Sequence, residues 1–140
     1  MTRVVVDASV VIKWSVPEVH SADALRYLDP GLGRHAPELL LAEISNILWK
    51  KVVRRELTRA EAERIAVDVG QADVTVHPMG PLFGTALRIA LETGRSAYDS
   101  MYLSLAEMLS TRMVTADRRL YDAVQASPYA GLVLWIEDGP

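Results

Sequence analysis

Apolar positions follow two different spacings along the chain, and these spacings predict a succession of short strands and helices. Short apolar runs closed by polar or turn-forming residues indicate buried strands, whereas apolar residues repeated every three to four positions indicate amphipathic helices. We expect strands at 4–6, 34–36, 74–76, 112–115 and 132–135. We expect helices at 9–14, 21–28, 37–54, 58–69, 81–91, 96–109 and 118–124.

Several of these predicted helices have recognisable ends. Pro17 stops the first helix, Thr58 and Glu61 form a capping box, and Gly94 suits a helix terminus. Strands that alternate with helices indicate an α/β layered fold with a mainly parallel sheet. Crossovers in such a sheet are right-handed, so the carboxyl ends of its strands gather along one edge. We see no internal repeat or linker, so 140 residues predict a single domain spanning 1–140.

Two acidic residues directly follow predicted strands. Asp7 ends the run Val4–Val6, and Asp117 comes just after Met113–Thr115. The carboxyl ends of parallel strands are where an open α/β sheet presents its ligand-binding groups. We therefore expect these two carboxylates to lie near each other.

Two further acids lie on predicted helices. Glu43 stands beside the apolar stripe of its helix, where a carboxylate is costly unless it is paired or bound to a cation. Asp99 lies in the first turn of the helix opened by Ser96. If both joined Asp7 and Asp117, the cluster would repel itself too strongly to stay ionised without a cation. The leading hypothesis is a carboxylate site for Mg²⁺ or Mn²⁺.

Each acid also has an ordinary structural explanation. Asp7 and Asp117 stand where a helix N-cap is expected after a strand. Asp99 fits the third position of a capping box opened by Ser96, and Glu43 can reach water from the margin of its stripe. These alternatives stay open, and a capping role is compatible with a role in a site.

Three uncharged polar residues are further candidates for the site: Thr115 as a member of the catalytic set with the four acids, and Ser9 and Asn46 in a supporting role. Thr115, at a strand end, would hydrogen-bond a ligand, a water or a phosphate. Ser9 would support a ligand water, and Asn46, one turn beyond Glu43, would contact the substrate or support the acids. Each also fits an ordinary place in a strand, a turn or a polar helix flank.

Composition narrows the class of protein. Half of the residues are hydrophobic, yet no apolar stretch approaches the roughly 20 residues of a membrane helix. The N-terminus does not have a signal-peptide layout. Cysteine is absent, which excludes disulfides, thiolate metal sites and a cysteine nucleophile. Together these features favour the cytoplasm.

Charge leaves a nucleic-acid partner open. A net charge of −3 argues against a uniformly basic binder, but local patches decide the question. The densest basic run comprises Lys50, Lys51, Arg54, Arg55 and Arg59. It is explained either as a solvated helix end or as a contact for a phosphate backbone.

Four segments, taken together and in this order, resemble the PIN-domain ribonucleases and, within them, the VapC toxins of bacterial toxin–antitoxin pairs. The segments are Val-Val-Val-Asp-Ala-Ser-Val-Val-Ile-Lys-Trp from Val4, Ala-Pro-Glu-Leu-Leu-Leu-Ala-Glu-Ile-Ser-Asn-Ile-Leu-Trp from Ala36, Ala-Tyr-Asp-Ser-Met-Tyr-Leu-Ser-Leu-Ala-Glu from Ala97 and Val-Thr-Ala-Asp-Arg-Arg-Leu from Val114. The likeness spans nearly the whole chain.

This resemblance implies a three-layer α/β/α sandwich and a metal-dependent endoribonuclease that acts as a toxin. The family's acid positions fall on Asp7, Glu43, Asp99 and Asp117, and its strand-end hydroxyl falls on Thr115. One or two Mg²⁺ ions, with Mn²⁺ as a substitute, would bind the acids and activate a water for in-line attack on RNA. The resemblance further implies a homodimer and a cognate antitoxin protein.

Other classes of protein fit the sequence less well. A phosphatase with an aspartate nucleophile needs a second acid two residues after the first, where this chain has Ser9. A receiver-like signalling domain needs an acid beside the first strand's Asp and a late lysine. No acid adjoins Asp7, and no lysine follows Lys51. A domain that only binds a partner would not require all four acids.

Overall fold

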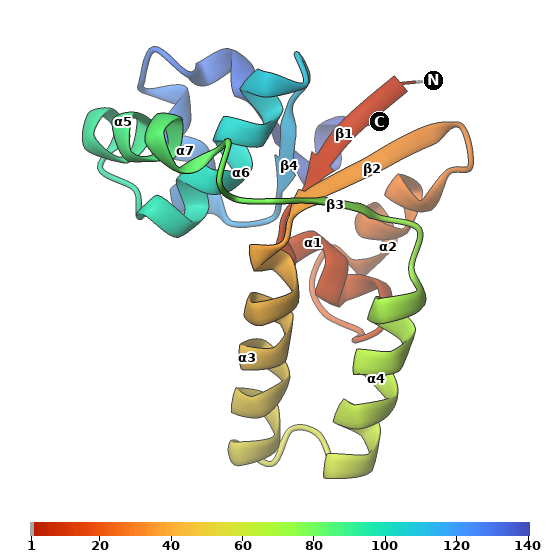
Figure 1. Ribbon diagram of the computed structural model, residues 1–140. Helices are drawn as coiled ribbons and strands as arrows, with labels where there is room; N and C mark the ends of the chain where they lie inside the picture. The colour runs from red at the N-terminus through yellow and green to blue at the C-terminus, as the bar shows by residue number, and fades with distance from the viewer. Residues whose placement is uncertain (1) are drawn as a thin grey trace.

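A five-stranded sheet forms the centre of the molecule, for which a computed structural model describes residues 2–140 (Figure 1). Its strands are β1 (Thr2–Val6), β2 (Leu32–Pro37), β3 (Thr75–His77), β4 (Met113–Thr115) and β5 (Val133–Trp135). They lie in the order β3-β2-β1-β4-β5, and every neighbouring pair is parallel. The predicted parallel α/β sheet is therefore confirmed.

Helices cover both faces of this sheet. They are α1 (Ala8–Val11), α2 (Ser21–Leu25), α3 (Leu39–Val53), α4 (Arg59–Gln71), α5 (Phe83–Thr93), α6 (Ala97–Met108) and α7 (Arg118–Gln125). Short 3₁₀ segments span Ile12–Trp14, Arg26–Leu28, Ala130–Leu132 and Ile136–Asp138. From β1 to β3 the chain adds strands on one side of β1, and from β3 to β5 it moves across the sheet in the opposite direction. Since crossovers are right-handed in both cases, helices α5–α7 lie on the face opposite to α2–α4. The three-layer α/β/α architecture is confirmed.

The core fills both faces of the middle strands, with α6 on one face and α1 and α3 on the other. Val5, Val6 and Val114 are fully buried, and Leu103 and Leu105 of α6 pack over them. Val-rich runs buried on both faces are typical of central parallel strands. This packing fixes the ends of β1 and β4 and the first turn of α6 relative to one another.

Several predicted boundaries differ from the observed ones, and two of these differences fall at the junction of β2 and α3. The long helix begins at Leu39, because Pro37 belongs to β2 and pairs with His77 of β3. The strand expected at 34–36 accordingly extends over Leu32–Pro37. Proline lacks the N–H that a central ladder would use, but the β1–β2 register ends at His35, so Pro37 has a strand neighbour only on the β3 side.

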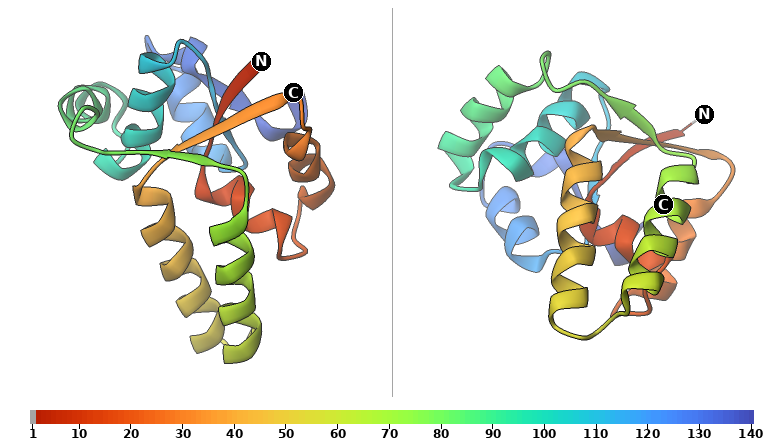
Figure 2. Two further views of the ribbon diagram at one scale, coloured as in Figure 1. Left: turned by 45° about the vertical axis from the view of Figure 1, so that its right-hand side comes forward. Right: turned by 60° about the horizontal axis from the view of Figure 1, so that its bottom comes forward.

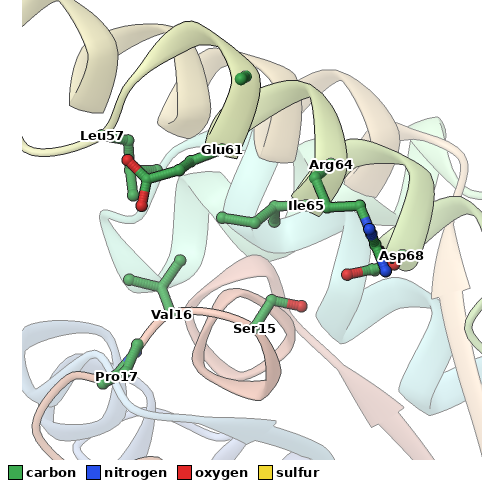
Figure 3. A pocket seen from close by; sticks show the side chains of 9 residues that line it. Ser15, Val16, Pro17, Leu57, Glu61, Arg64, Ile65 and Asp68 are labelled. Atoms are coloured by element: carbon green, nitrogen blue, oxygen red, sulfur yellow. Dashed lines mark hydrogen bonds and ion pairs between the residues drawn. The ribbon is translucent and has the colours of Figure 1, made fainter.

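Helices α3 and α4 form an antiparallel pair that extends away from the sheet (Figures 1 and 2). The predicted capping box is present at the start of α4, where Thr58 accepts a hydrogen bond from the Glu61 backbone and Glu61 accepts one from the Thr58 backbone. A hollow of about 500 Å³ separates α4 from the loop at Val16–Pro17 (Figure 3). None of the helices within residues 2–140 is long and apolar enough to cross a membrane.

Candidate active site

The strand order of the sheet reverses between β1 and β4. From β1 the chain adds β2 and β3 on one side, then returns to add β4 and β5 on the other. At such a reversal the connections leave in opposite directions and open a crevice at the carboxyl ends of the strands. Asp7 directly follows β1, Thr115 ends β4 and Asp117 lies two residues further on. The crevice is therefore bordered by the two strand-end acids.

All four predicted acids line one hollow of about 180 Å³. The α3 helix brings Glu43 to it, and the first turn of α6 brings Asp99. The full lining consists of Asp7, Ala8, Ser9, Glu43, Ile47, Asp99, Tyr102 and Asp117. Four segments distant in sequence thus meet at one place.

Asp7 is the most deeply buried of the acids. One carboxylate oxygen accepts hydrogen bonds from the Ser9 hydroxyl at 2.5 Å and from the Val10 backbone at 3.2 Å. The other accepts one from the Thr115 hydroxyl at 2.7 Å. Burial raises the pKa of Asp7 to about 7, although these three donors lower it and Asp99 raises it slightly further. Asp7 is therefore the N-cap of α1 and, within the described residues 2–140, a carboxylate without an ion-pair partner.

Ser9 and Thr115 connect Asp7 to the end of β4. The Ser9 hydroxyl accepts a hydrogen bond from the Ala116 backbone at 3.0 Å, and the Thr115 hydroxyl accepts one from the Asp117 backbone at 3.0 Å. Each hydroxyl donates its single proton to the Asp7 carboxylate, and both hydroxyls therefore orient that carboxylate. The geometry gives Ser9 and Thr115 a positioning role.

Glu43 faces the hollow from α3. It accepts a hydrogen bond of 2.5 Å from the Tyr102 hydroxyl, and Tyr102 is buried on α6. Burial raises the pKa of Glu43; the Tyr102 hydrogen bond opposes that rise and the nearby Asp99 adds to it. Glu43 thus remains at the site and does not turn to water at the margin of its helix.

Asp99 and Asp117 share a single cation, Arg95. The Arg95 Nη2 lies 3.1 Å from the Asp99 carboxylate and 3.7 Å from that of Asp117. Ser96 caps α6 by accepting from the Asp99 backbone, so half of the predicted capping box forms, and the Asp99 side chain turns to Arg95. Asp117 caps α7 with its other oxygen, which accepts from the Arg119 and Leu120 backbones.

The donor set matches a hard divalent cation. Carboxylate oxygens are the ligands that Mg²⁺ prefers, and this ion keeps several waters, so it needs only one or two of them directly. Asp7, a buried carboxylate with no cationic side chain beside it among residues 2–140, is the feature that such an ion would satisfy. In the arrangement described for residues 2–140, however, no three acidic or histidine side chains converge closely enough to hold a metal.

The sequence analysis did not identify Arg95 or Tyr102 as site residues. It did propose Asn46, which does not line the hollow with the acids. Arg95 lies four residues before Asp99, outside the helix, so helical spacing gave no reason to connect them. Tyr102 lies three residues after Asp99 on α6, and this spacing places the two residues on one helix face. It is the sequence signal that would have identified Tyr102 as a site residue. Asn46 is exposed and is not part of the hollow's lining, so its supporting role stays a prediction.

Comparison with known proteins identifies the family of this chain. The family model of the PIN domain matches residues 4–125. The chain is 31% identical to ribonuclease VapC3 of Pyrobaculum aerophilum over 126 residues, which cover 89% of this chain and 96% of that protein. It is 37% identical to ribonuclease VapC9 of Mycobacterium tuberculosis over 92 residues, 66% of this chain and 71% of that one.

Solved structures show the same fold. PAE2754 from Pyrobaculum aerophilum superposes with a TM-score of 0.69 at 26% identity, covering 97% of this chain and 85% of that one. A chain from the structure of VapBC2 from Rickettsia felis bound to a DNA fragment of its promoter gives a TM-score of 0.66 at 11% identity. The match covers 96% of this chain and 98% of that one. The chain therefore belongs to the PIN-domain family, within its VapC-like branch.

Proposed function

We propose that this protein is a Mg²⁺-dependent endoribonuclease that acts in the cytoplasm as the toxin of a toxin–antitoxin pair. The observation that carries the proposal is the meeting of Asp7, Glu43, Asp99 and Asp117 around one hollow, where Asp7 is buried and pairs with no cationic side chain from the described part of the chain. The similarity to ribonucleases VapC3 and VapC9 supports the reaction class.

In this proposal, Asp7, Asp99 and Asp117 hold the ion, and Glu43 binds it directly or through a water. When bound, Mg²⁺ or Mn²⁺ supplies a water of lowered pKa and neutralises charge on the phosphate oxygens. Ser9 and Thr115 keep the Asp7 carboxylate in place, as their hydrogen bonds indicate. Glu43 or Asp99 orients the attacking water or accepts its proton, and Tyr102 fixes the Glu43 carboxylate.

RNA as the substrate is supported by a basic hollow beside the acidic one. This hollow of about 260 Å³ shares Ser9 and Ile47 with the acidic hollow and is otherwise lined by Ile12, Lys13, Glu18, Lys50, Lys51, Arg54 and Glu56. Its four cations outnumber its two acids, in a protein of net charge −3. A strand whose scissile phosphate reaches the acidic hollow would continue over these cations, which attract neighbouring phosphates.

A homodimer is supported by an exposed stripe on α5. Phe83, Leu87 and Leu91 recur every four residues and are 64%, 55% and 77% exposed. A stripe of this kind is costly in water unless a partner covers it. We assign it to a second copy of the chain, so light scattering should report a dimer for the wild type and a monomer for Leu87→Glu.

An antitoxin partner is supported by the hollow between α4 and the Val16–Pro17 loop. Its floor is apolar, with Val16, Leu57 and Ile65, and its rim carries Glu61 and Arg64 (Figure 3). We assign it to an apolar segment of the antitoxin, in line with the structural likeness to a toxin–antitoxin complex from Klebsiella pneumoniae. Ala60 of α4 also lines this hollow, so co-purification of the neighbouring gene's product with the wild type, but not with Ala60→Arg, would test this assignment.

The nuclease proposal is tested by incubating the purified protein with single-stranded RNA. We expect cleavage with Mg²⁺ or Mn²⁺ and none in excess chelator. Asp7→Asn and Asp99→Asn should each lower the rate at least 100-fold while circular dichroism shows an intact fold, as removal of groups acting in the transition state does. Arg119→Ala, which removes an exposed charge from α7, serves as the control. Equal cleavage in chelator would refute the metal requirement.

The receiver-like alternative lacks support. A receiver sheet has the strand order 2-1-3-4-5, whereas this sheet has the order 3-2-1-4-5. The lining of the acidic hollow also contains no lysine to contact a phosphorylated Asp7. Covalent labelling of Asp7 by acetyl phosphate would revive this alternative.

A further inference from the structure

Arg95 reaches the acidic hollow from the connection between α5 and α6. Gly94 ends α5 with a φ of 76°, in the left-handed region, and this turn delivers Arg95 to the start of α6. The Thr93 hydroxyl accepts the Arg95 backbone N–H at 3.2 Å and so fixes the turn. The Arg95 side chain is only 25% exposed.

The arginine is bound to the two acids incompletely. A single nitrogen, Nη2, faces both the Asp99 and Asp117 carboxylates, at 3.1 and 3.7 Å. A guanidinium can bind a carboxylate through two parallel hydrogen bonds, and this one does not. Its Nε is buried and, within residues 2–140, has no hydrogen-bond partner. A buried donor left unpaired destabilises the arrangement, so this contact is one that another cation can displace.

Arg95 also neutralises only part of the hollow. Asp7 is held by two hydroxyls and a backbone N–H, and Glu43 by the Tyr102 hydroxyl. Four acids and one arginine leave an excess of three negative charges when all the acids are ionised. A divalent cation would compensate this excess better than the arginine does, but it would need oxygens that now face Arg95.

We infer that Arg95 is an internal counter-ion that holds Asp99 and Asp117 while the site contains no metal and competes with the divalent cation for them. This inference rests on the metal site of the proposed function and adds a residue that sets its affinity. Because binding the cation requires the arginine to leave, part of the binding free energy is used to displace it. Arg95 therefore raises the cation concentration at which the site fills.

The test is the affinity of the full-length protein for Mn²⁺, followed by electron paramagnetic resonance. We expect Arg95→Ala and Arg95→Gln to bind Mn²⁺ about tenfold more tightly than the wild type, the equivalent of one charge-assisted contact. In chelator both variants should melt at a lower temperature than the wild type, and saturating Mn²⁺ should abolish that difference. Arg88→Ala is the matched control, because Arg88 pairs with Glu107 on the exposed side of α5 and α6.

Two results would contradict the inference in different ways. If the wild type binds Mn²⁺ and either folded Arg95 variant binds it equally or more weakly, Arg95 is not a competitor, and the proposed nuclease site stands. If neither the wild type nor the variants bind Mn²⁺, the proposed metal site is wrong, and the inference fails with it. Arg95→Gln keeps the length of the side chain and provides the measurement should Arg95→Ala not fold.

Discussion

At the scale of single residues, Asp7 combines a structural and a chemical role. Its carboxylate caps α1 through Val10 and is held by Ser9 and Thr115. These donors favour the ionised form, but burial outweighs them and raises the pKa of Asp7 to about 7. Near neutral pH the metal-free protein thus holds a carboxylate that is reluctant to ionise, which is the state a cation would relieve.

This raised pKa predicts how stability changes with pH. The pKa in the folded state, about 7, lies above the value near 4 expected in the unfolded chain, so folding favours protonated Asp7. The stability that this provides is full below about pH 4 and is lost as pH rises through 7, by up to about 4 kcal/mol. In chelator, Asp7→Asn should therefore unfold at a higher denaturant concentration than the wild type at pH 8, with a smaller difference at pH 5.

The difference in stability between the wild type and Asp7→Asn separates the contribution of Asp7 from those of other titrating groups. Burial also lowers the pKa of His35, and this acts in the opposite direction by making the fold less stable at low pH. Since His35 is present in both proteins, its contribution cancels in the difference. A difference between wild type and Asp7→Asn that does not change from pH 5 to pH 8 would contradict a raised pKa for Asp7.

At the scale of elements, α3 carries groups of opposite charge at different distances from the crevice. Glu43 lies at the acidic hollow, while Lys50 and Arg54 lie about 10 and 16 Å further along the helix. Lys51 and Lys13 are engaged by Glu18. Lys50 and Arg54 form no ion pair with any residue from 2 to 140 and are exposed, so they are the cations available to a substrate.

The Lys50→Ala/Arg54→Ala variant should therefore bind RNA more weakly. In an Asp99→Asn background, which prevents turnover, we expect a loss of affinity and a shallower dependence on salt. Each lost phosphate contact should lower the slope of log K against log salt by about 0.7 for single strands. Arg59→Ala/Arg64→Ala removes the same charge from α4 and should leave fluorescence anisotropy titrations unchanged. An unaltered slope in the α3 variant would show that this basic hollow does not contact the strand.

The elements also show where sequence patterns suffice. Short apolar runs correctly indicated all five strands, and apolar residues spaced three to four apart indicated the long helices. Thr58 with Glu61 marked the start of α4. The pattern did not locate the junction of β2 and α3, because Pro37 suits the first turn of a helix as well as the end of a strand. The pairing of Pro37 with His77 decides that boundary, and such a distant contact has no local signal.

At the scale of the whole molecule, the strand order explains why the acids meet. Asp7 and Asp117 each cap the helix that follows them, and Asp99 pairs with the nearby Arg95; these local roles alone would not bring the acids together. The reversal of order between β1 and β4 brings Asp7 and Asp117 to adjacent strand ends, and packing of α6 on the sheet adds Asp99. Sequence order and family resemblance predicted this meeting. The extent of the single domain over 1–140 stays a prediction.

The contact of Arg95 with Asp99 and Asp117 could not be predicted from the sequence, because it too depends on the folded arrangement. Asp117 lies 22 residues further along the chain, on the loop after β4, and only the folded crevice brings it to the arginine. Arg95 belongs to no element and to none of the four segments that resemble the family. Its place at the site follows from the turn at Gly94 together with the position of α6.

The most direct test of a shared divalent cation is a crystal structure of the protein grown with Mn²⁺, with anomalous diffraction data. We predict a single strong anomalous peak, or two close together, in the acidic hollow, with oxygens of Asp7 and of at least one of Asp99 and Asp117 at about 2.0–2.3 Å. The Arg95 guanidinium should have moved away from those oxygens. An empty hollow at saturating Mn²⁺, with Arg95 still between Asp99 and Asp117, would contradict the account.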